Sequence, residues 1–319
     1  MVKVERYRSN PLIRPNRDHP WEALAASNGS ITKDNGKFHM VYRAISYKQN
    51  YHERNLNLSA IGHTISDDGI NFGDGRLFIK SEFGWEIFGC EDPRITRING
   101  KYFIFYTALS NYPPTDSSIK IGLAITKDFV NVEKHPVTFF NSKAMALFPE
   151  KINGKLVAIL TVNTDIPPAK ICLAFFDEES QIWSEDYWKS WFFSSEEHVV
   201  LLPDTKNDQI EVGAPPVKTK HGWLIVYANI KDYLSPPRTF GIEAVLLDLK
   251  NPFKVIGRTK KTLLVPEMEY ELYGVVPHVI FPSGAIVQNG DLFIYYGAAD
   301  TTCCLAICNL DKLIEEMLI

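Results

Sequence analysis

The chain lacks the features that mark membrane proteins, secreted proteins and nucleic-acid-binding proteins. No apolar run reaches the length of a membrane-spanning helix, and no apolar stretch follows the charged residues 1–6. We therefore expect a cytoplasmic protein with no membrane partner. No run rich in Lys and Arg is present and the net charge is -4, which argues against a nucleic-acid partner because such partners favour a basic face.

Cysteine is scarce, and its spacing excludes the common zinc sites. The chain has five cysteines, which are Cys90, Cys172, Cys303, Cys304 and Cys308. No pair of Cys-x-x-Cys units is present, so we predict no metal site. Most of these thiols lie in apolar, strand-like runs, and we expect them to be reduced and buried.

Long helical stripes are scarce too, and a repeat of strand-like segments takes their place. In five segments a turn containing Gly precedes an alternating apolar and aromatic run, at residues 36–43, 100–106, 154–160, 222–227 and 290–296. Each is followed by a second strand-like run, at residues 58–65, 119–126, 169–176, 239–247 and 302–307. This pattern predicts antiparallel hairpins. The one short helix we expect covers residues 311–318.

The repeat predicts an all-β fold. The unit recurs at roughly 55–70 residues, which is somewhat longer than the usual propeller period. Five such units predict a five-bladed β-propeller with an axial active-site pocket, formed as a single catalytic domain over residues 1–319. A pair of β-sandwiches and a β-helix are the alternatives, and the hairpin signals and the long unit disfavour both.

The stretch 88–94 carries the strongest chemical signal. Glu91 and Asp92 are adjacent carboxylates, Pro93 restricts the backbone before it, and Arg94 follows. A carboxylate on a rigid turn beside an aromatic segment suits acid or base chemistry on a sugar. The alternative is a surface turn with a local Asp–Arg pair.

Ordered motifs along nearly the whole chain resemble glycoside hydrolase family 130, the β-mannoside phosphorylases and related β-mannosidases. The motifs are Gly-Cys-Glu-Asp-Pro-Arg at 89–94, Ala-Leu-Phe-Pro-Glu-Lys at 146–151, Gly-Ala-Pro-Pro-Val-Lys at 213–218, Phe-Pro-Ser-Gly at 281–284 and Tyr-Gly-Ala-Ala-Asp at 296–300. The resemblance implies a five-bladed propeller, which agrees with the repeat, and an inverting single displacement without a cofactor.

The resemblance also implies roles for individual residues. Asp92 is the expected general acid and passes its proton through a hydroxyl of the bound mannose. Arg94 is expected to orient Asp92 or Glu91. The expected substrate-binding residues are Asn28, Arg43, Arg54, Glu91, Arg94, Lys143 and Asp300. For Asn28 and Asp300 the alternative role is a residue of a turn.

The cations that hold phosphate in the family's phosphorylases are missing here. A His-Arg pair is replaced within Ile-Leu-Thr-Val-Asn at 159–163, a Lys by Glu211, and a His within Tyr-Ala-Asn at 227–229. A carboxylate would repel phosphate but could activate water. We therefore predict a β-mannosidase, most plausibly for β-1,2-linked oligosaccharides, with Glu211 or Glu243 as the base.

Other functions remain open at this point. An inverting β-mannoside phosphorylase that uses inorganic phosphate as co-substrate is the first alternative, since Lys143, Lys231 or Arg238 could bind the phosphate. A carbohydrate-binding propeller without catalysis is the second. Five-bladed glycosidases of arabinosides or fructosides are the third. The expected partner is a β-mannoside oligosaccharide, and a homo-oligomer is left open.

Overall fold

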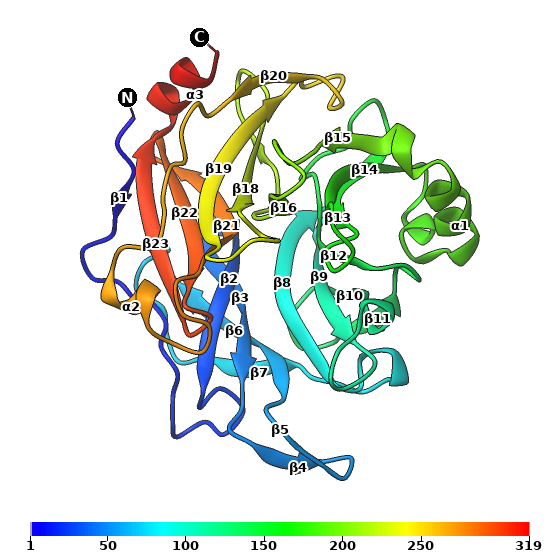
Figure 1. The fold of residues 1–319 in the computed structure, drawn as a ribbon, viewed down its shortest axis with the longest axis vertical. Coiled ribbons are helices and arrows are strands. Elements are labelled where there is room, and N and C mark those ends of the chain that lie inside the picture. The colour runs from blue at the N-terminus through cyan, green and yellow to red at the C-terminus, as the bar shows by residue number, and fades with distance from the viewer. Residues whose placement is uncertain (1, 319) are drawn as a thin grey trace.

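We describe a computed structural model of the chain, which covers residues 2–318. Met1 and Ile319, the two ends of the single domain that we expected, lie outside the described residues. The fold is mostly β, as the repeat predicted (Figure 1). None of its described helices is long and apolar enough to cross a membrane.

Most strands belong to five antiparallel meanders. The first consists of β2 (Ala25–Asp34), β3 (Lys37–Ile45), β6 (Ser59–Ser66) and β7 (Arg76–Ile79). The second consists of β8 (Gly89–Ile98), β9 (Lys101–Leu109), β10 (Ile119–Thr126) and β11 (Glu133–Pro136). The third consists of β12 (Ser142–Leu147), β13 (Leu156–Val162), β14 (Lys170–Phe176) and β15 (Val199–Leu201).

The fourth and fifth meanders follow the same order. The fourth consists of β16 (Gln209–Val212), β17 (Val217–Lys218), β18 (Trp223–Lys231), β19 (Thr239–Leu247) and β20 (Val255–Arg258). The fifth consists of β21 (Ile280–Gln288), β22 (Asp291–Ala298) and β23 (Thr302–Asn309), with β1 (Glu5–Arg6) paired to β23. A separate hairpin, β4 (Gln49–Tyr51) and β5 (Arg54–Leu56), projects from the body (Figure 1).

The predicted hairpins are confirmed strand by strand. The five glycine turns precede β3, β9, β13, β18 and β22, and the second predicted runs form β6, β10, β14, β19 and β23. The first strands of the meanders lie beside one another: β2 contacts β8 and β21, and β12 contacts β8 and β16. Residues of these first strands, which are far apart in the chain, are thereby brought together in space.

Bulges interrupt the pairing of these first strands at corresponding places. The register shifts between Ser27 and Ser30 in β2 and between Glu91 and Arg94 in β8. Similar shifts occur in β12 and β21. In β2 and β8 the inserted residues include Asn28 and Asp92, which have φ of 53° and 50°. A bulge re-aims a side chain out of the regular alternation, and this happens where the polar residues gather.

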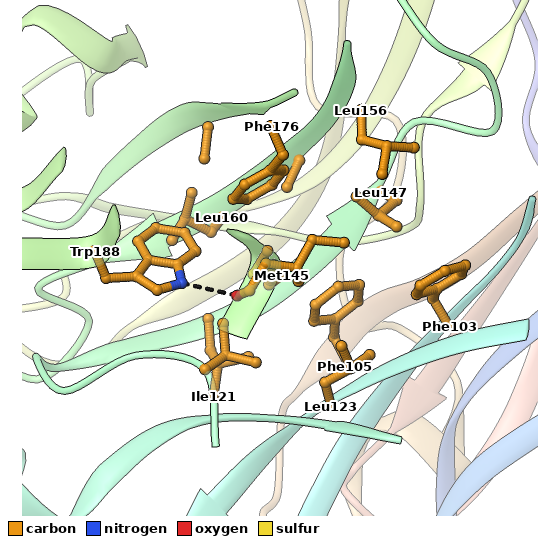
Figure 2. Packing of buried hydrophobic residues seen from close by; sticks show 14 of the residues in the cluster. Phe103, Phe105, Ile121, Leu123, Met145, Leu147, Leu156, Leu160, Phe176 and Trp188 are labelled. Carbon is orange, nitrogen blue, oxygen red and sulfur yellow. Dashed lines mark hydrogen bonds between the residues drawn. The ribbon is translucent and has the colours of Figure 1, made fainter. Parts of the chain in front are cut away.

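The largest apolar cluster lies between the second and third meanders and under α1 (Glu185–Phe193), as Figure 2 shows. Trp188 is completely buried, and its indole Nε1 donates a hydrogen bond of 2.8 Å to the Ile182 carbonyl oxygen. Fully burying a side chain of this kind stabilises the fold by roughly 1.5–3 kcal/mol. The cluster therefore packs the second meander against the third.

The C-terminal helix was predicted and α1 was not. Residues 311–318 lie in α3 (Leu310–Leu318), while α2 (Glu269–Leu272) is a single turn. Helix α1 begins after Ser184, whose hydroxyl accepts a hydrogen bond from the Tyr187 amide. Its buried residues Trp188 and Trp191 are three positions apart, the spacing of one helix face. All five cysteines are unpaired and buried, and burial of the thiols was predicted.

Candidate active site

A cavity of about 250 Å³ opens where the first strands of the meanders meet. Seven of the residues expected from the sequence line it, namely Asn28, Arg43, Glu91, Asp92, Lys143, Glu211 and Asp300. They come from all five meanders or from the turns between their strands. The tertiary structure therefore brings together residues that are up to 272 positions apart in the chain, from Asn28 to Asp300.

The carboxylate of Asp92 accepts a hydrogen bond and faces a cation in the cavity. Its Oδ1 accepts a hydrogen bond of 2.6 Å from Asn28 Nδ2 and lies 3.6 Å from Arg43 Nη1. Burial favours the neutral acid, but Arg43, Arg94 and the hydrogen bond from Asn28 outweigh it and lower the pKa of Asp92. These contacts favour the anionic form of Asp92.

Arg43 lies at the centre of a group of three carboxylates. Its Nη2 donates a hydrogen bond of 2.6 Å to Glu91 Oε1, which also accepts one of 2.7 Å from Ser59 Oγ. Its Nη1 lies 3.6 Å from Asp92 Oδ1 and 3.9 Å from Asp300 Oδ2. One cation therefore faces three acids in a largely buried space.

Asp300 differs from Asp92 although both face Arg43. It lies in the turn between β22 and β23, with φ of 48°, and no described residue donates a hydrogen bond to its side chain. Burial, with Asp92 and Glu91 nearby, outweighs Arg43 and Lys143 and raises the pKa of Asp300 to about 6. Asp300 is therefore the carboxylate of this group that most readily holds a proton.

Glu211 and Lys143 form a second charged group in the cavity, together with Asp165. Glu211 lies on β16, and burial raises its pKa to about 7 in spite of the opposing charges of Lys143 and Arg94. Lys143 Nζ lies 3.6 Å from Asp165 Oδ1. Burial disfavours the charged amine, but Glu211 and Asp165 raise the pKa of Lys143. Near neutral pH, Glu211 can therefore both accept and release a proton.

Arg94 lies behind the cavity and ties these two groups to each other. The residue is almost completely buried. Its Nη1 donates a hydrogen bond of 2.6 Å to the Asp92 carbonyl oxygen, and its Nε donates one of 3.0 Å to the Gly213 carbonyl oxygen. Gly213 follows β16, which carries Glu211. Arg94 therefore links the backbone of Asp92 to the segment that follows the strand of Glu211.

Comparison with known proteins places the chain in a family. A family model described as beta-1,4-mannooligosaccharide phosphorylase, that of glycoside hydrolase family 130, matches residues 4–318. The chain belongs to this family. It is 34% identical to the 1,2-beta-oligomannan phosphorylase of Thermoanaerobacter sp. strain X514, over 96% of this chain and 97% of that protein.

Solved structures of family 130 share the fold. The beta-1,2-mannobiose phosphorylase of Listeria innocua, solved as a complex with beta-1,2-mannobiose, matches with a TM-score of 0.82 and 26% identity, over 98% of this chain and 99% of that one. Another structure, with a TM-score of 0.74, 20% identity and coverage of 98% and 95%, is described by the words "The GH130 family of mannoside phosphorylases contains glycoside hydrolases that target beta-1,2 mannosidic linkages in Candida mannan". At that identity it is evidence of the fold alone.

Three of the predicted site residues, Arg94, Glu243 and Arg54, lie outside the cavity lining. Glu243 accepts hydrogen bonds from Tyr227, Asn229 and Thr262, at 2.9–3.0 Å, so that both of its oxygens are occupied within the fourth meander and its flanking segment. Arg54 lies on the exposed β4–β5 hairpin, with its guanidinium 5.1 Å from the centre of the Phe88 ring.

Other residues that line the cavity were not among the predicted site residues. They include Thr164, Asp165, Gln209, Tyr233 and Phe240, whereas Arg238, which also lines the cavity, was expected from the sequence as an alternative phosphate ligand. Thr164 Oγ1 and Gln209 Oε1 are buried and have no hydrogen-bond partner among the described residues. Thr164 and Asp165 directly follow β13, and Gln209 begins β16. Their position at the ends of strands was the available signal, but polar residues at strand ends are common.

The described residues hold another cavity, of about 390 Å³, between α3 and residues 259–263. Its lining is mainly apolar and includes Lys260, Lys261 and Glu316. Glycoside cleavage needs a pair of acids in one site. The cavity around Asp92 therefore remains the candidate active site. No group of three or more His, Cys, Asp or Glu residues within 2–318 is arranged to bind a metal ion.

Proposed function

We propose that this chain cleaves β-1,2-linked mannosides with inversion of configuration, as a single catalytic domain whose five meanders are the blades of a propeller around the cavity. The observation that carries this proposal is the position of Asp92, on a bulge in a polar cavity that is also lined by a second, largely buried acid, Glu211. Inverting glycosidases need an acid on one side of the bond and room for a nucleophile on the other. The linkage is proposed from the names of the relatives.

The residues around Arg43 suit the sugar whose bond is cleaved. Asn28, Arg43, Glu91 and Asp300 present several donors and acceptors around Asp92, and hydroxyl groups of a mannose unit can bind all of them. Asp92 would protonate the leaving oxygen through a hydroxyl of that sugar. Neither Arg54 nor Glu243 is needed in this assignment, because neither lines the cavity.

Phosphorolysis, in which phosphate is the nucleophile, is the first candidate reaction. The relative that shares 34% identity with nearly the whole chain is named a phosphorylase. Lys143 and Arg238 line the cavity and could bind an inorganic phosphate co-substrate. Its product would be mannose 1-phosphate, and no cofactor would take part.

Hydrolysis is the second candidate, and the charges of the site favour it. The cavity is lined by five carboxylates (Glu91, Asp92, Asp165, Glu211 and Asp300) and by three cationic side chains (Arg43, Lys143 and Arg238). Those of the carboxylates that are ionised would repel a phosphate dianion, whereas they would not repel a water molecule. Glu211, with a pKa of about 7, is suited to accept the proton of that water.

Product analysis on β-1,2-mannobiose, with and without inorganic phosphate, tests both candidates. Mannose 1-phosphate formed only with phosphate would establish phosphorolysis. Free mannose formed at a rate independent of phosphate would establish hydrolysis. Absence of turnover on β-1,2-, β-1,3- and β-1,4-linked mannosides, together with tight binding of one of them, would contradict the proposal and favour a carbohydrate-binding propeller.

A further inference from the structure

The proposed role of Asp92 as an acid conflicts with its surroundings in the free enzyme. A general acid must carry a proton when the bond breaks. Asp92 accepts a short hydrogen bond from Asn28, faces Arg43 at 3.6 Å, and lies next to the buried guanidinium of Arg94. Each of these three groups stabilises the ionised carboxylate. The resting site therefore has to hold the catalytic proton somewhere other than on Asp92.

Asp300 has the opposite environment within the same group. The Nη1 atom of Arg43 lies within 4 Å of both carboxylates, so the two acids share one face of a single cation. The other groups that face Asp300 are Glu91 and Lys143. Unlike Asp92, Asp300 accepts no hydrogen bond from any described residue, and only about 22% of its side chain is exposed. A carboxylate without donors in a buried site is the one that takes up a proton.

We infer that, of these two carboxylates, Asp300 is the one that takes up the catalytic proton in the free enzyme as the pH falls, and that Asp92 becomes protonated only when substrate bridges the two residues. This inference rests on the proposed function, since it assigns a role in glycoside cleavage. It separates two tasks: Asp300 stores the proton, and Asp92, held by Asn28 and Arg94, delivers it in a fixed geometry.

The proton balance of the step is simple. A hydroxyl of the bound sugar that contacts both carboxylates accepts a proton from Asp300 and releases its own toward Asp92, so that Asp300 becomes the anion and Asp92 the neutral acid. Asp92 then protonates the glycosidic oxygen, through a hydroxyl of the sugar as proposed above, while the bond to the anomeric carbon breaks. In hydrolysis the attacking water loses its proton to Glu211. Exchange with solvent afterwards returns a proton to Asp300 and removes one from Glu211.

The location of the proton can be measured in the free enzyme by carboxyl ¹³C NMR. The full chain would be labelled at the aspartate side chains and titrated between pH 4 and pH 8. Asp92→Asn and Asp300→Asn assign the two resonances, because each variant removes one of them. Asn is suited to both positions, since it tolerates the left-handed backbone that both residues adopt. Asp165→Asn is the matched control, as Asp165 lines the same cavity but has Lys143 as its neighbour.

The expected result is that Asp300 titrates near pH 6 and that Asp92 remains ionised over most of the range. In Asp92→Asn the Asp300 resonance should persist, with its midpoint shifted to lower pH because a neighbouring negative charge is gone. The inference is overturned if Asp92 titrates at the higher pH, or if both residues are ionised throughout. Because the titration uses no substrate, either result is independent of whether the chain cleaves mannosides, which the product analysis decides.

Discussion

The ionisation of Glu211 should decide which nucleophile the site accepts. Below pH 7 the side chain is neutral and can donate a hydrogen bond to a phosphate oxygen, whereas above pH 7 it is an anion that repels phosphate and can activate water. We therefore predict that mannose 1-phosphate, if it forms, accumulates mainly below pH 7. Hydrolysis to free mannose should increase as the pH rises through 7.

The size of the effect follows from the dimensions of the cavity. A sphere with the volume of this cavity, about 250 Å³, is only about 8 Å across. Any phosphate inside it therefore lies close to Glu211. At roughly 6 Å and an effective dielectric constant of about 20, two unit charges repel each other by about 3 kcal/mol. Ionisation of Glu211 should thus weaken phosphate binding by about 100-fold, since about 1.4 kcal/mol corresponds to a factor of ten.

The assay compares wild type with Glu211→Gln on β-1,2-mannobiose, in phosphate, from pH 5 to pH 9. The variant should lose hydrolysis by a factor of about 10²–10⁴, the usual contribution of a general base. If the variant uses phosphate, its phosphate binding should no longer weaken as the pH rises through 7. Glu243→Gln is the control, because it makes the same change at a carboxylate outside the cavity. A product ratio that is independent of pH, and equal in wild type and Glu211→Gln, would refute this reasoning.

Three further predictions concern single residues of the site. Asp92→Asn should lower kcat by about 10²–10⁴ in a protein that still folds, since Asn tolerates the backbone of Asp92; full turnover would disprove its role as the acid. Glu211→Gln should stabilise the fold by up to about 3 kcal/mol above pH 7 and by nothing below about pH 4, because a raised pKa means that ionisation of the wild-type acid costs folding energy. Equal denaturant midpoints at pH 8 would contradict this. Gly297→Ala places its Cβ 1.8 Å from Asn28 Oδ1, so it should displace Asn28 from Asp92 and lower kcat about 10- to 100-fold, and an unaltered kcat would show that this hydrogen bond is dispensable.

The strands of this protein could be predicted from the sequence because the signals that specify strands lie in short stretches of chain. Alternation of apolar residues and glycine turns depends on neighbours along the chain, so β9, β18 and β22 appear where the repeat predicted them. Helix α1 was not predicted because its signal is short and lies within an aromatic-rich segment. That signal consists of two buried tryptophans, three residues apart, after a capping serine. The family and the role expected of Asp92 also follow from linear motifs.

The composition of the site depended on the tertiary structure. Glu211 and Glu243 look alike in sequence, as single acids in apolar strands, yet one lines the cavity and the other binds Tyr227, Asn229 and Thr262. Likewise, Asp92 and Asp300 are both acids with a left-handed backbone. The groups that surround each carboxylate make the pKa of Asp92 lower and that of Asp300 higher. The sequence determined which residues could ionise. Burial and charges from other meanders, which depend on distance in space, decided which of them hold a proton.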